Sequence, residues 1–317
     1  MEYPILSIYI ATYNHEKYIT QALDSVFMQE TNYSYEVIVG EDCSTDNTRS
    51  ILKEYENLHH ELVEDGVLSV IYRDHNMYRE NPSNIIDLIQ RCRGKYIIAL
   101  EGDDYWTDKN KIQSQVDFLE KNPDYIATAH RCIVVDENSK MREEDYPDCR
   151  EKDYTLQHFM ANKFPGQTTT VLYRNIYKMG TVDTSIFSLG LMPGDKLRNF
   201  VLLINGRIRC FPQKMSAYRH VVHSGDSWSA IYDYEFETEF KFYSGLLDYA
   251  NNQRKSEFIL AAEALVFRCL AKGVKRRAVS ISDFYKYVKC LNHKLFACSK
   301  WIKYKFFKDF LKKEYWY

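Results

Sequence analysis

The chain has 317 residues, 45% hydrophobic and 27% charged, which predicts a globular protein with one large domain or two smaller ones. We expect a cytoplasmic protein, because the sequence has no membrane-spanning apolar run, no signal peptide at its N-terminus and no Cys-x-x-Cys pair among its eight cysteines. The net charge of -2 combines an acidic part, residues 1–270, with a basic one, residues 271–317, and the acidic main part argues against nucleic acid as a partner.

Strands and helices are expected to alternate through the first 130 residues. Short apolar runs bounded by polar residues predict strands at residues 5–11, 37–39, 67–72, 96–100 and 125–129. Apolar residues at helical spacing predict helices between them, with inward faces that include Ile19, Ala22, Leu23, Val26 and Phe27, then Ile51, Leu52 and Tyr55, then Ile85, Leu88 and Ile89, then Ile112, Val116 and Leu119. This alternation predicts an α/β fold with a mostly parallel sheet covered by helices on both faces.

An acidic turn follows the predicted strand at residues 96–100. Gly102 permits a tight bend, so Asp103 and Asp104 are expected at the carboxyl end of a central strand, where open α/β sheets bind ligands. Two carboxylates there suit a hard divalent cation such as Mg²⁺ or Mn²⁺. The alternative is a solvated acidic turn, which is common on protein surfaces.

Two other polar loops should open on the same edge of the sheet. They contain Tyr13 and Asn14 after the first strand and Asp42 after the second. An aromatic ring and a carboxylate suit a nucleobase, although Tyr13 could be a packed loop aromatic and Asp42 a cap or turn residue. The sequence contains neither a dinucleotide-binding glycine fingerprint nor a Walker phosphate loop, which weakens a nucleotidyltransferase as an alternative.

Three motifs together resemble those of the family-two glycosyltransferases of the GT-A fold, of the bacterial glycan-biosynthesis type. They are residues 7–14, residues 40–48, and residues 100–106 followed by Lys109. The resemblance covers residues 4–230 and implies sugar transfer from a nucleotide-sugar donor with inversion, assisted by Mn²⁺ or Mg²⁺. Two departures are Ala11, where a proline is frequent, and Glu41, where an aspartate is more usual.

The resemblance also implies roles for individual residues. Tyr13 and Asp42 are expected to contact the nucleobase, and Asp103 and Asp104 are expected to contact the metal and the diphosphate. Asp104 is expected to be the direct metal ligand. The expected nucleotide-sugar site comprises Ala11, Tyr13, Asn14, Glu16, Asp42, Asp103 and Trp106.

The second half of the chain should supply the acceptor pocket and a general base. Residues 164–170 resemble the loop that lines the sugar and acceptor pocket. Asp195, at the head of a predicted helix, matches the position of the base, which an acceptor hydroxyl needs in order to become a nucleophile. The alternative for Asp195 is an N-cap of that helix. His223 resembles a histidine that returns to the metal or diphosphate, and its alternative is a structural role.

The C-terminal region differs from the rest. We expect residues 1–231 to form the GT-A domain, with a nucleotide-sugar half at 1–130 and an acceptor half at 131–231, and residues 232–317 to form a helical appendage. From residue 271 onward the chain has 13 Lys and Arg against 3 Asp and Glu. Aromatic residues interleave with these lysines near the end, which favours peripheral contact with an anionic membrane at the inner face of the cell membrane. A helix packed on its own domain and a homodimer contact are the alternatives.

Two functions therefore remain. The first is an inverting transferase that moves a sugar from a nucleotide-sugar donor, which we expect to be a UDP-sugar, to a hydroxyl of a glycan or lipid-linked acceptor. The second is a catalytically silent nucleotide-sugar-binding or scaffold protein of a glycan-assembly complex. The sequence retains the candidate base Asp195 and the candidate metal carboxylates Asp103 and Asp104, whose loss would have indicated the second function.

Overall fold

The computed structural model of the chain describes residues 3–77, 83–191, 193–221, 235–289 and 291. The chain divides into two compact units. The first comprises residues 1–154, 164–184 and 206–221, and the second comprises residues 155–163, 185–205 and 222–317. Residues 155–163 and 185–205, which we expected in the first domain, thus group with the second unit, and the expected boundary after residue 231 lies outside the described residues.

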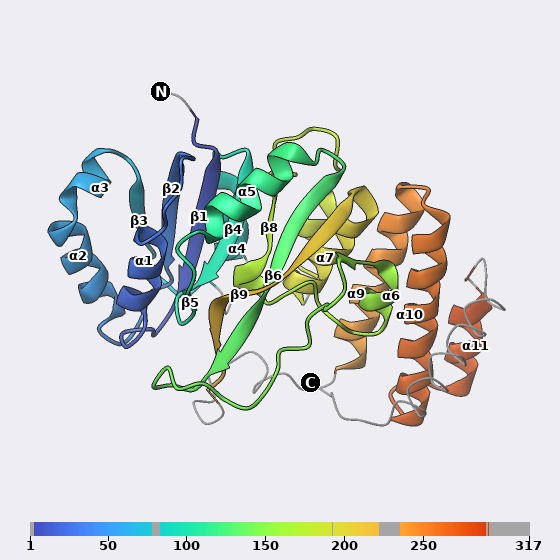
Figure 1. Ribbon diagram of the computed structural model, residues 1–317. Coiled ribbons are helices and arrows are strands. Elements are labelled where there is room, and N and C mark those ends of the chain that lie inside the picture. Colours follow the sequence, from blue (N-terminus) through green and yellow to red (C-terminus); the bar gives the residue numbers. More distant parts are fainter. Residues whose placement is uncertain (1–2, 78–82, 192, 222–234, 290, 292–317) are drawn as a thin grey trace. The chain divides into compact units, whose positions relative to one another are not determined.

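The first unit is built on one mixed sheet in the order β3-β2-β1-β4-β8-β6-β9-β5, with β7 paired to β9 (Figure 1). The strands are β1 (Leu6–Thr12), β2 (Tyr35–Glu41), β3 (Leu68–Tyr72), β4 (Tyr96–Glu101), β5 (Tyr105–Trp106), β6 (Tyr125–Val135), β7 (Asp153–Tyr154), β8 (Leu172–Arg174) and β9 (Arg207–Arg219). Strands β3, β2, β1 and β4 are mutually parallel, as expected. Beyond them β8 runs antiparallel to both β4 and β6.

Helices cover both faces of the parallel part of the sheet. They are α1 (Ile19–Phe27), α2 (Thr48–Leu58), α3 (His60–Glu64), α4 (Ser83–Arg91) and α5 (Lys111–Lys121). Side chains of α1, α2 and α5 share one buried cluster with alternate residues of β1, β2 and β4, while α4 contacts β1 and β2 from behind in the view of Figure 1. The expected two-sided cover is therefore present.

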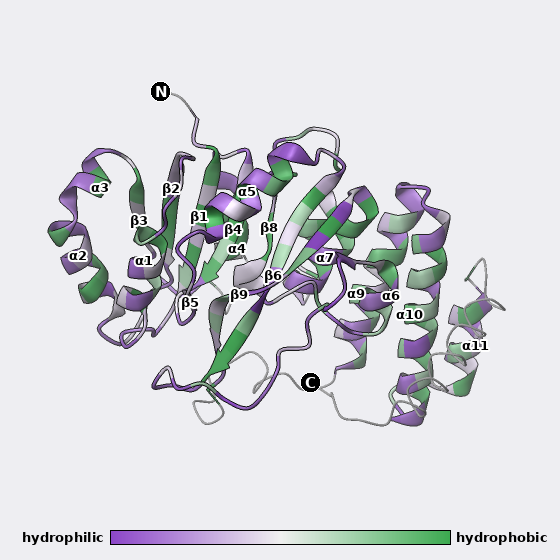
Figure 2. Cartoon of the chain, viewed as in Figure 1, coloured by the Kyte–Doolittle hydropathy of each residue, from purple (hydrophilic) through white to green (hydrophobic). Residues whose placement is uncertain are grey.

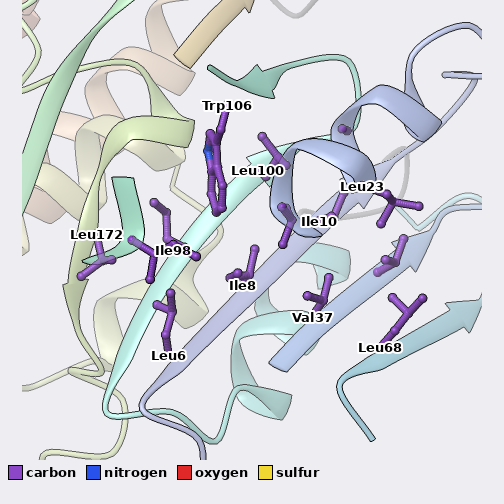
Figure 3. Packing of buried hydrophobic residues seen from close by; sticks show 14 of the residues in the cluster. Leu6, Ile8, Ile10, Leu23, Val37, Leu68, Ile98, Leu100, Trp106 and Leu172 are labelled. Carbon is purple, nitrogen blue, oxygen red and sulfur yellow. The ribbon is translucent and has the colours of Figure 1, made fainter. Parts of the chain in front are cut away.

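The parallel strands are hydrophobic along most of their length (Figure 2). Leu6, Ile8 and Ile10 of β1 have no exposed surface and point into the cluster that α1 covers (Figure 3). Because successive side chains of a strand point to opposite faces, the intervening Ser7 and Tyr9 face the other side, and both are buried there. Burial on both faces explains why these strands appear in the sequence as continuous apolar runs.

Strand β9 pairs in parallel with β6, and a bulge interrupts the pairing. His130 pairs with Phe211, whereas the next residue, Arg131, pairs with Lys214, so Pro212 and Gln213 lie in the interruption. A proline lacks the amide hydrogen that a continuous ladder requires, which accounts for its place at a bulge. Past the bulge, β9 runs to Arg219 and also pairs with β5, directly after the acidic turn.

The second unit is helical in its described residues. Its helices are α6 (Leu156–Met160), α7 (Gly194–Asn205), α9 (Phe236–Asn252), α10 (Ser256–Lys275) and α11 (Ile281–Lys289), with a 3-10 turn at Ser185–Leu189. The ring of Phe200 on α7 contacts Phe159 and Phe258, at centroid distances of 5.4 and 5.6 Å. Helix α10 is buried along most of its length against α9. Among the described residues, no helix is both long and apolar enough to cross a membrane.

Candidate functional site

Three loops follow three neighbouring strands at one edge of the first unit's sheet. Strand β1 lies between β2 and β4, and Ala11 pairs with Gly40 on one side and Glu101 on the other. The loops after these strands contain Tyr13, Asp42 and Asp103, so the expected shared edge is present. Asp42 donates its backbone N–H to the carbonyl oxygen of Thr12 at 3.0 Å, which joins the two loops directly.

Gly102 allows the acidic turn to approach the loop after β1. Its backbone N–H donates to the carbonyl oxygen of Ala11 at 3.0 Å. A Cβ atom added to Gly102 would lie 2.7 Å from both the Thr12 hydroxyl and the His15 Nδ1 atom, closer than real Cβ contacts. The turn therefore requires glycine for close approach.

Both carboxylate oxygens of Asp104 are held by the protein. The backbone N–H of Arg219 donates to Oδ1 at 2.8 Å, and Nε2 of Gln167 donates to Oδ2 at 2.9 Å. Asp104 is 2% exposed, whereas Asp103 retains partial exposure. Burial, followed by the neighbouring charge of Asp103, raises the pKa of Asp104 well above its ordinary value. A negative charge on Asp104 is thus unfavourable by itself, and a cation beside the two carboxylates would stabilise it.

The donor set at the turn fits a hard divalent cation. Asp103 and Asp104 provide carboxylate oxygens, which are the preferred ligands of Mg²⁺ and also bind Mn²⁺. Each oxygen of a carboxylate has two lone-pair directions, so the hydrogen bonds to Asp104 leave acceptor capacity on both of its oxygens. The turn could therefore hold such an ion together with the diphosphate of a nucleotide.

Asn14 and Glu16 connect the loop after β1 to the loop after β2. Asn14 has a positive φ of 56°, and its side-chain oxygen accepts from the backbone N–H of Thr45 at 2.8 Å. A carboxylate oxygen of Glu16 accepts from the backbone N–H of Asn47 at 3.0 Å. These side chains hold the two loops together, and Tyr13, directly before Asn14, is partly exposed.

Asp42 is almost completely buried, although the sequence predicted that it contacts a nucleobase. It is 2% exposed, and its Oδ1 accepts from the backbone N–H of Met77 at 2.9 Å. Asp42 therefore fixes the loop after β3, which corresponds to the turn-residue alternative. A role of Asp42 in binding the nucleobase stays a prediction.

Trp106 is buried in the hydrophobic core, and its contacts hold the chain directly after the acidic turn. It is 1% exposed, and its indole N–H donates to the carbonyl oxygen of Thr169 at 3.2 Å. The ammonium of Lys111 lies 4.1 Å from the centre of its ring. Through Trp106 and Gln167, the turn is tied to the loop at residues 164–170 that we expected near the sugar and acceptor.

Asp195 lies in the second unit, in the first turn of α7. Its Oδ1 accepts from the backbone N–H of Lys196 at 2.7 Å, and its carboxylate remains partly exposed. Burial lowers the pKa of Lys196, and the charge of Asp195 acts in the opposite direction. The role of Asp195 as a base stays a prediction, and His223 lies outside the described residues.

Sequence reasoning missed two partners of the acidic turn, Gln167 and Arg219. Gln167 was included only as part of the loop at residues 164–170, and Arg219 was not singled out. Arg219 is separated from Asp104 by 115 residues and Gln167 by 63. A short motif carries no signal for such distant partners, and only the β9 pairing brings Arg219 to the turn.

The fold is that of an α/β protein with an acidic, cation-compatible turn at the carboxyl ends of its parallel strands. The model of the family described as glycosyl transferase family 2 matches residues 7–179, more than half of the chain. The chain belongs to this family.

The chain is also similar to individual relatives and to a solved structure. An uncharacterized protein of Mycobacterium tuberculosis is 31% identical over 227 residues, which are 72% of this chain and 61% of that protein. The chain thus spans less than two thirds of this relative's length. The poly(ribitol-phosphate) beta-N-acetylglucosaminyltransferase TarS of Staphylococcus aureus is 30% identical over 118 residues, 37% of this chain and 19% of TarS.

The crystal structure of residues 1–349 of S. aureus TarS in complex with UDP-GlcNAc has a similar fold, with a TM-score of 0.58 and 18% identity. The alignment covers 92% of this chain and 81% of that one. The expected GT-A architecture is thereby confirmed.

Proposed function

We propose that this chain is an inverting glycosyltransferase that moves a sugar from a nucleotide-sugar donor, a UDP-sugar, to a hydroxyl of a glycan or lipid-linked acceptor. The observation that carries the proposal is the Asp103-Asp104 turn beside the Tyr13 loop, in a chain of glycosyl transferase family 2. The TarS complex with UDP-GlcNAc supports a UDP-sugar as the donor class.

Residues of the first unit bind and orient the donor. Tyr13, partly exposed at the sheet edge, stacks on the base, and the Asp103-Asp104 turn faces the diphosphate. Asp103 and Asp104 would hold Mn²⁺ or Mg²⁺, which would supply positive charge to stabilise the departing nucleotide diphosphate. Hydrogen bonds from Arg219 and Gln167 keep the Asp104 carboxylate in one orientation, so little reorganisation is needed when the donor binds.

The acceptor hydroxyl is activated by Asp195. Its carboxylate takes the hydroxyl proton as the acceptor oxygen bonds to the anomeric carbon, and the bond from that carbon to the diphosphate oxygen breaks. Attack from the face opposite the leaving group inverts the anomeric centre. The products are the glycosylated acceptor and the nucleoside diphosphate, and the proton remains on Asp195 until solvent removes it.

The metal assignment is tested with Asp104→Ala. We expect this variant to lose Mn²⁺-dependent binding of UDP-sugar, measured by calorimetry, and Asp103→Ala to do less harm, because Asp104 is the proposed direct ligand. Asp124→Ala is the matched control, since Asp124 is an exposed carboxylate that pairs with Arg207. Donor affinity in Asp104→Ala equal to that of the control would remove the metal assignment.

The base assignment is tested with Asp195→Asn. Asparagine can still accept the hydrogen bond from Lys196, so the start of α7 should be preserved. The transfer rate should fall by about 10²–10⁴-fold, the usual contribution of a positioned base, with donor affinity unchanged. Initial rates with a working donor and acceptor pair measure the effect. A rate within about tenfold of the parent would identify Asp195 as a cap, because a base contributes more than that.

We also propose that the basic, aromatic C-terminal residues bring the protein to the anionic inner face of the cell membrane. The support is compositional, since residues 271–317 carry 13 Lys and Arg against 3 Asp and Glu. A lipid-linked acceptor would be encountered at that surface.

A further inference from the structure

Arg219 lies at the end of β9 and directly beneath the acidic turn. It is 3% exposed, so its guanidinium is removed from bulk solvent. Its Nε donates to the carbonyl oxygen of Asp103 at 2.8 Å, and its backbone N–H donates to Asp104 Oδ1 at 2.8 Å. One residue therefore holds both the peptide between the two aspartates and one of their carboxylates.

The rest of the guanidinium reaches two other segments. Nη1 donates to the carbonyl oxygen of Asp136 at 2.9 Å, and Nη2 donates to Oε1 of Gln21 on α1 at 2.9 Å. Both terminal nitrogens also lie 3.2 Å from the Ser139 hydroxyl. All five N–H groups of the side chain thus have acceptors, which a shorter cation with a single nitrogen could not reproduce.

Aromatic contact completes the environment of Arg219. The centre of its guanidinium lies 4.2 Å from the ring centre of Tyr18 and 5.6 Å from that of Tyr105. A buried guanidinium over an aromatic face is stabilised by the ring's negative face. Tyr18 precedes α1 and Tyr105 follows the acidic turn, so the stack fixes the turn against the start of that helix.

We propose that Arg219 is a positioning residue that fixes the Asp103-Asp104 turn in the geometry that holds the metal and the donor diphosphate. It acts through the turn and touches neither ligand. This inference rests on the proposed function, because it presupposes that the turn binds a metal with the nucleotide.

Arg174 offers a matched control in the same unit. Its Nε and Nη2 donate to the carbonyl oxygens of Tyr125 and Leu119 at 2.8 and 2.7 Å, and its guanidinium lies over the ring of Tyr96. Arg174 pairs with Tyr96, at the opposite end of β4 from the acidic turn. Arg174→Lys therefore loses the same kind of contacts as Arg219→Lys, but away from the turn.

The test compares UDP binding with and without Mn²⁺ by calorimetry, together with the melting temperature. The metal enhancement is the factor by which Mn²⁺ tightens UDP binding. In Arg219→Lys we expect this factor to fall by about 10–100-fold, the usual cost of removing a partner of a metal ligand. UDP affinity without metal should not change. Arg174→Lys should lose comparable melting temperature but keep the parental enhancement.

The outcomes separate the inference from the proposed function. An enhancement in Arg219→Lys equal to that in Arg174→Lys would make Arg219 a purely structural residue and overturn the inference alone. No enhancement in the parent protein would reject the metal assignment itself and the inference with it. If Arg219→Lys does not fold, the variant Gln21→Ala is measured instead, because it removes one acceptor of Arg219 Nη2. A reduced metal enhancement in Gln21→Ala supports the inference, and a metal enhancement equal to that of the parent overturns it.

Discussion

Two buried cations of the first unit have very different surroundings. Arg219 has acceptors for all of its N–H groups, whereas Lys111, with no exposed surface, donates to Oε1 of Gln115 at 2.8 Å and lies over the ring of Trp106. Burial lowers the pKa of Lys111 well below its ordinary value. The charged form of Lys111 is thus disfavoured in the fold, while an arginine in the same unit remains charged.

The shifted pKa of Lys111 makes stability depend on pH. Above the ordinary lysine pKa, both folded and unfolded states are neutral at this position. As the pH falls through that value, the unfolded state gains a proton and the folded state does not, so the folded state loses stability. Lys111→Met should therefore gain stability relative to the parent as the pH falls from about 10.5 to about 8.

Urea unfolding at several pH values measures this difference. Lys121→Met, on the same helix α5 but with a largely exposed side chain, is the control and should show little pH-dependent difference. A constant difference between Lys111→Met and the parent across this range would contradict the shifted pKa.

At the scale of elements, the parallel half of the sheet and its helices could be predicted because their patterns are local. Continuous apolar runs identified β1 and β4, and the apolar spacing of residues 19–27 identified the helix α1. The strand β9 was not predicted. Residues 207–210 alternate polar and apolar, but this pattern is short, and Pro212 suggests a break where the structure has a bulge.

The candidate site also contains some residues that local sequence patterns predicted and others that they did not. Asp103 and Asp104 were predicted because Gly102 and the preceding strand are adjacent in sequence, and the neighbouring strand ends placed Tyr13 beside them. Their partners Gln167 and Arg219 come from elements whose pairing depends on the long-range packing of β6, β8 and β9. A single sequence does not specify such packing.

The acidic turn should be intolerant of a side chain at Gly102. Gly102→Ala would place a methyl group against Thr12 and His15, so we expect a loss of about 1–3 kcal/mol in the free energy of unfolding, typical of overpacking. Gly194→Ala is the control, because no atom lies within 4 Å of its added Cβ. Denaturant titration compares the two. Equal free energies of unfolding for both variants would contradict this prediction, because they would mean that the turn can shift to accommodate the added methyl group.

Positively and negatively charged residues are distributed unequally along the chain. Residues 1–270 carry 29 Lys and Arg against 41 Asp and Glu, while the remaining residues are strongly basic. The acidic part should be repelled by an anionic surface and the basic part attracted. Residues 292–317, which hold most of the interleaved aromatic side chains, lie outside the described residues.

Removal of residues 296–317 should release the protein from anionic liposomes. Co-sedimentation at low and high salt measures binding, which salt should weaken because screening shortens the range of charge attraction. Hydrolysis of the donor by water should persist in the shortened protein and serves as the control for folding. Full-length protein that stays in the supernatant at low salt would favour a packing or dimer contact for this segment.

The hydrogen bond between Arg219 and Gln21 joins residues 198 positions apart. During synthesis the N-terminal residues emerge first, so β1 to β4 can pair long before β9 exists. The two aspartates are then already in the chain, without the arginine that holds their turn. We therefore expect a nascent chain to acquire its sheet early and its donor site late, only after the ribosome has passed residue 219. Until then the growing polypeptide would have little capacity to capture nucleotide-sugar.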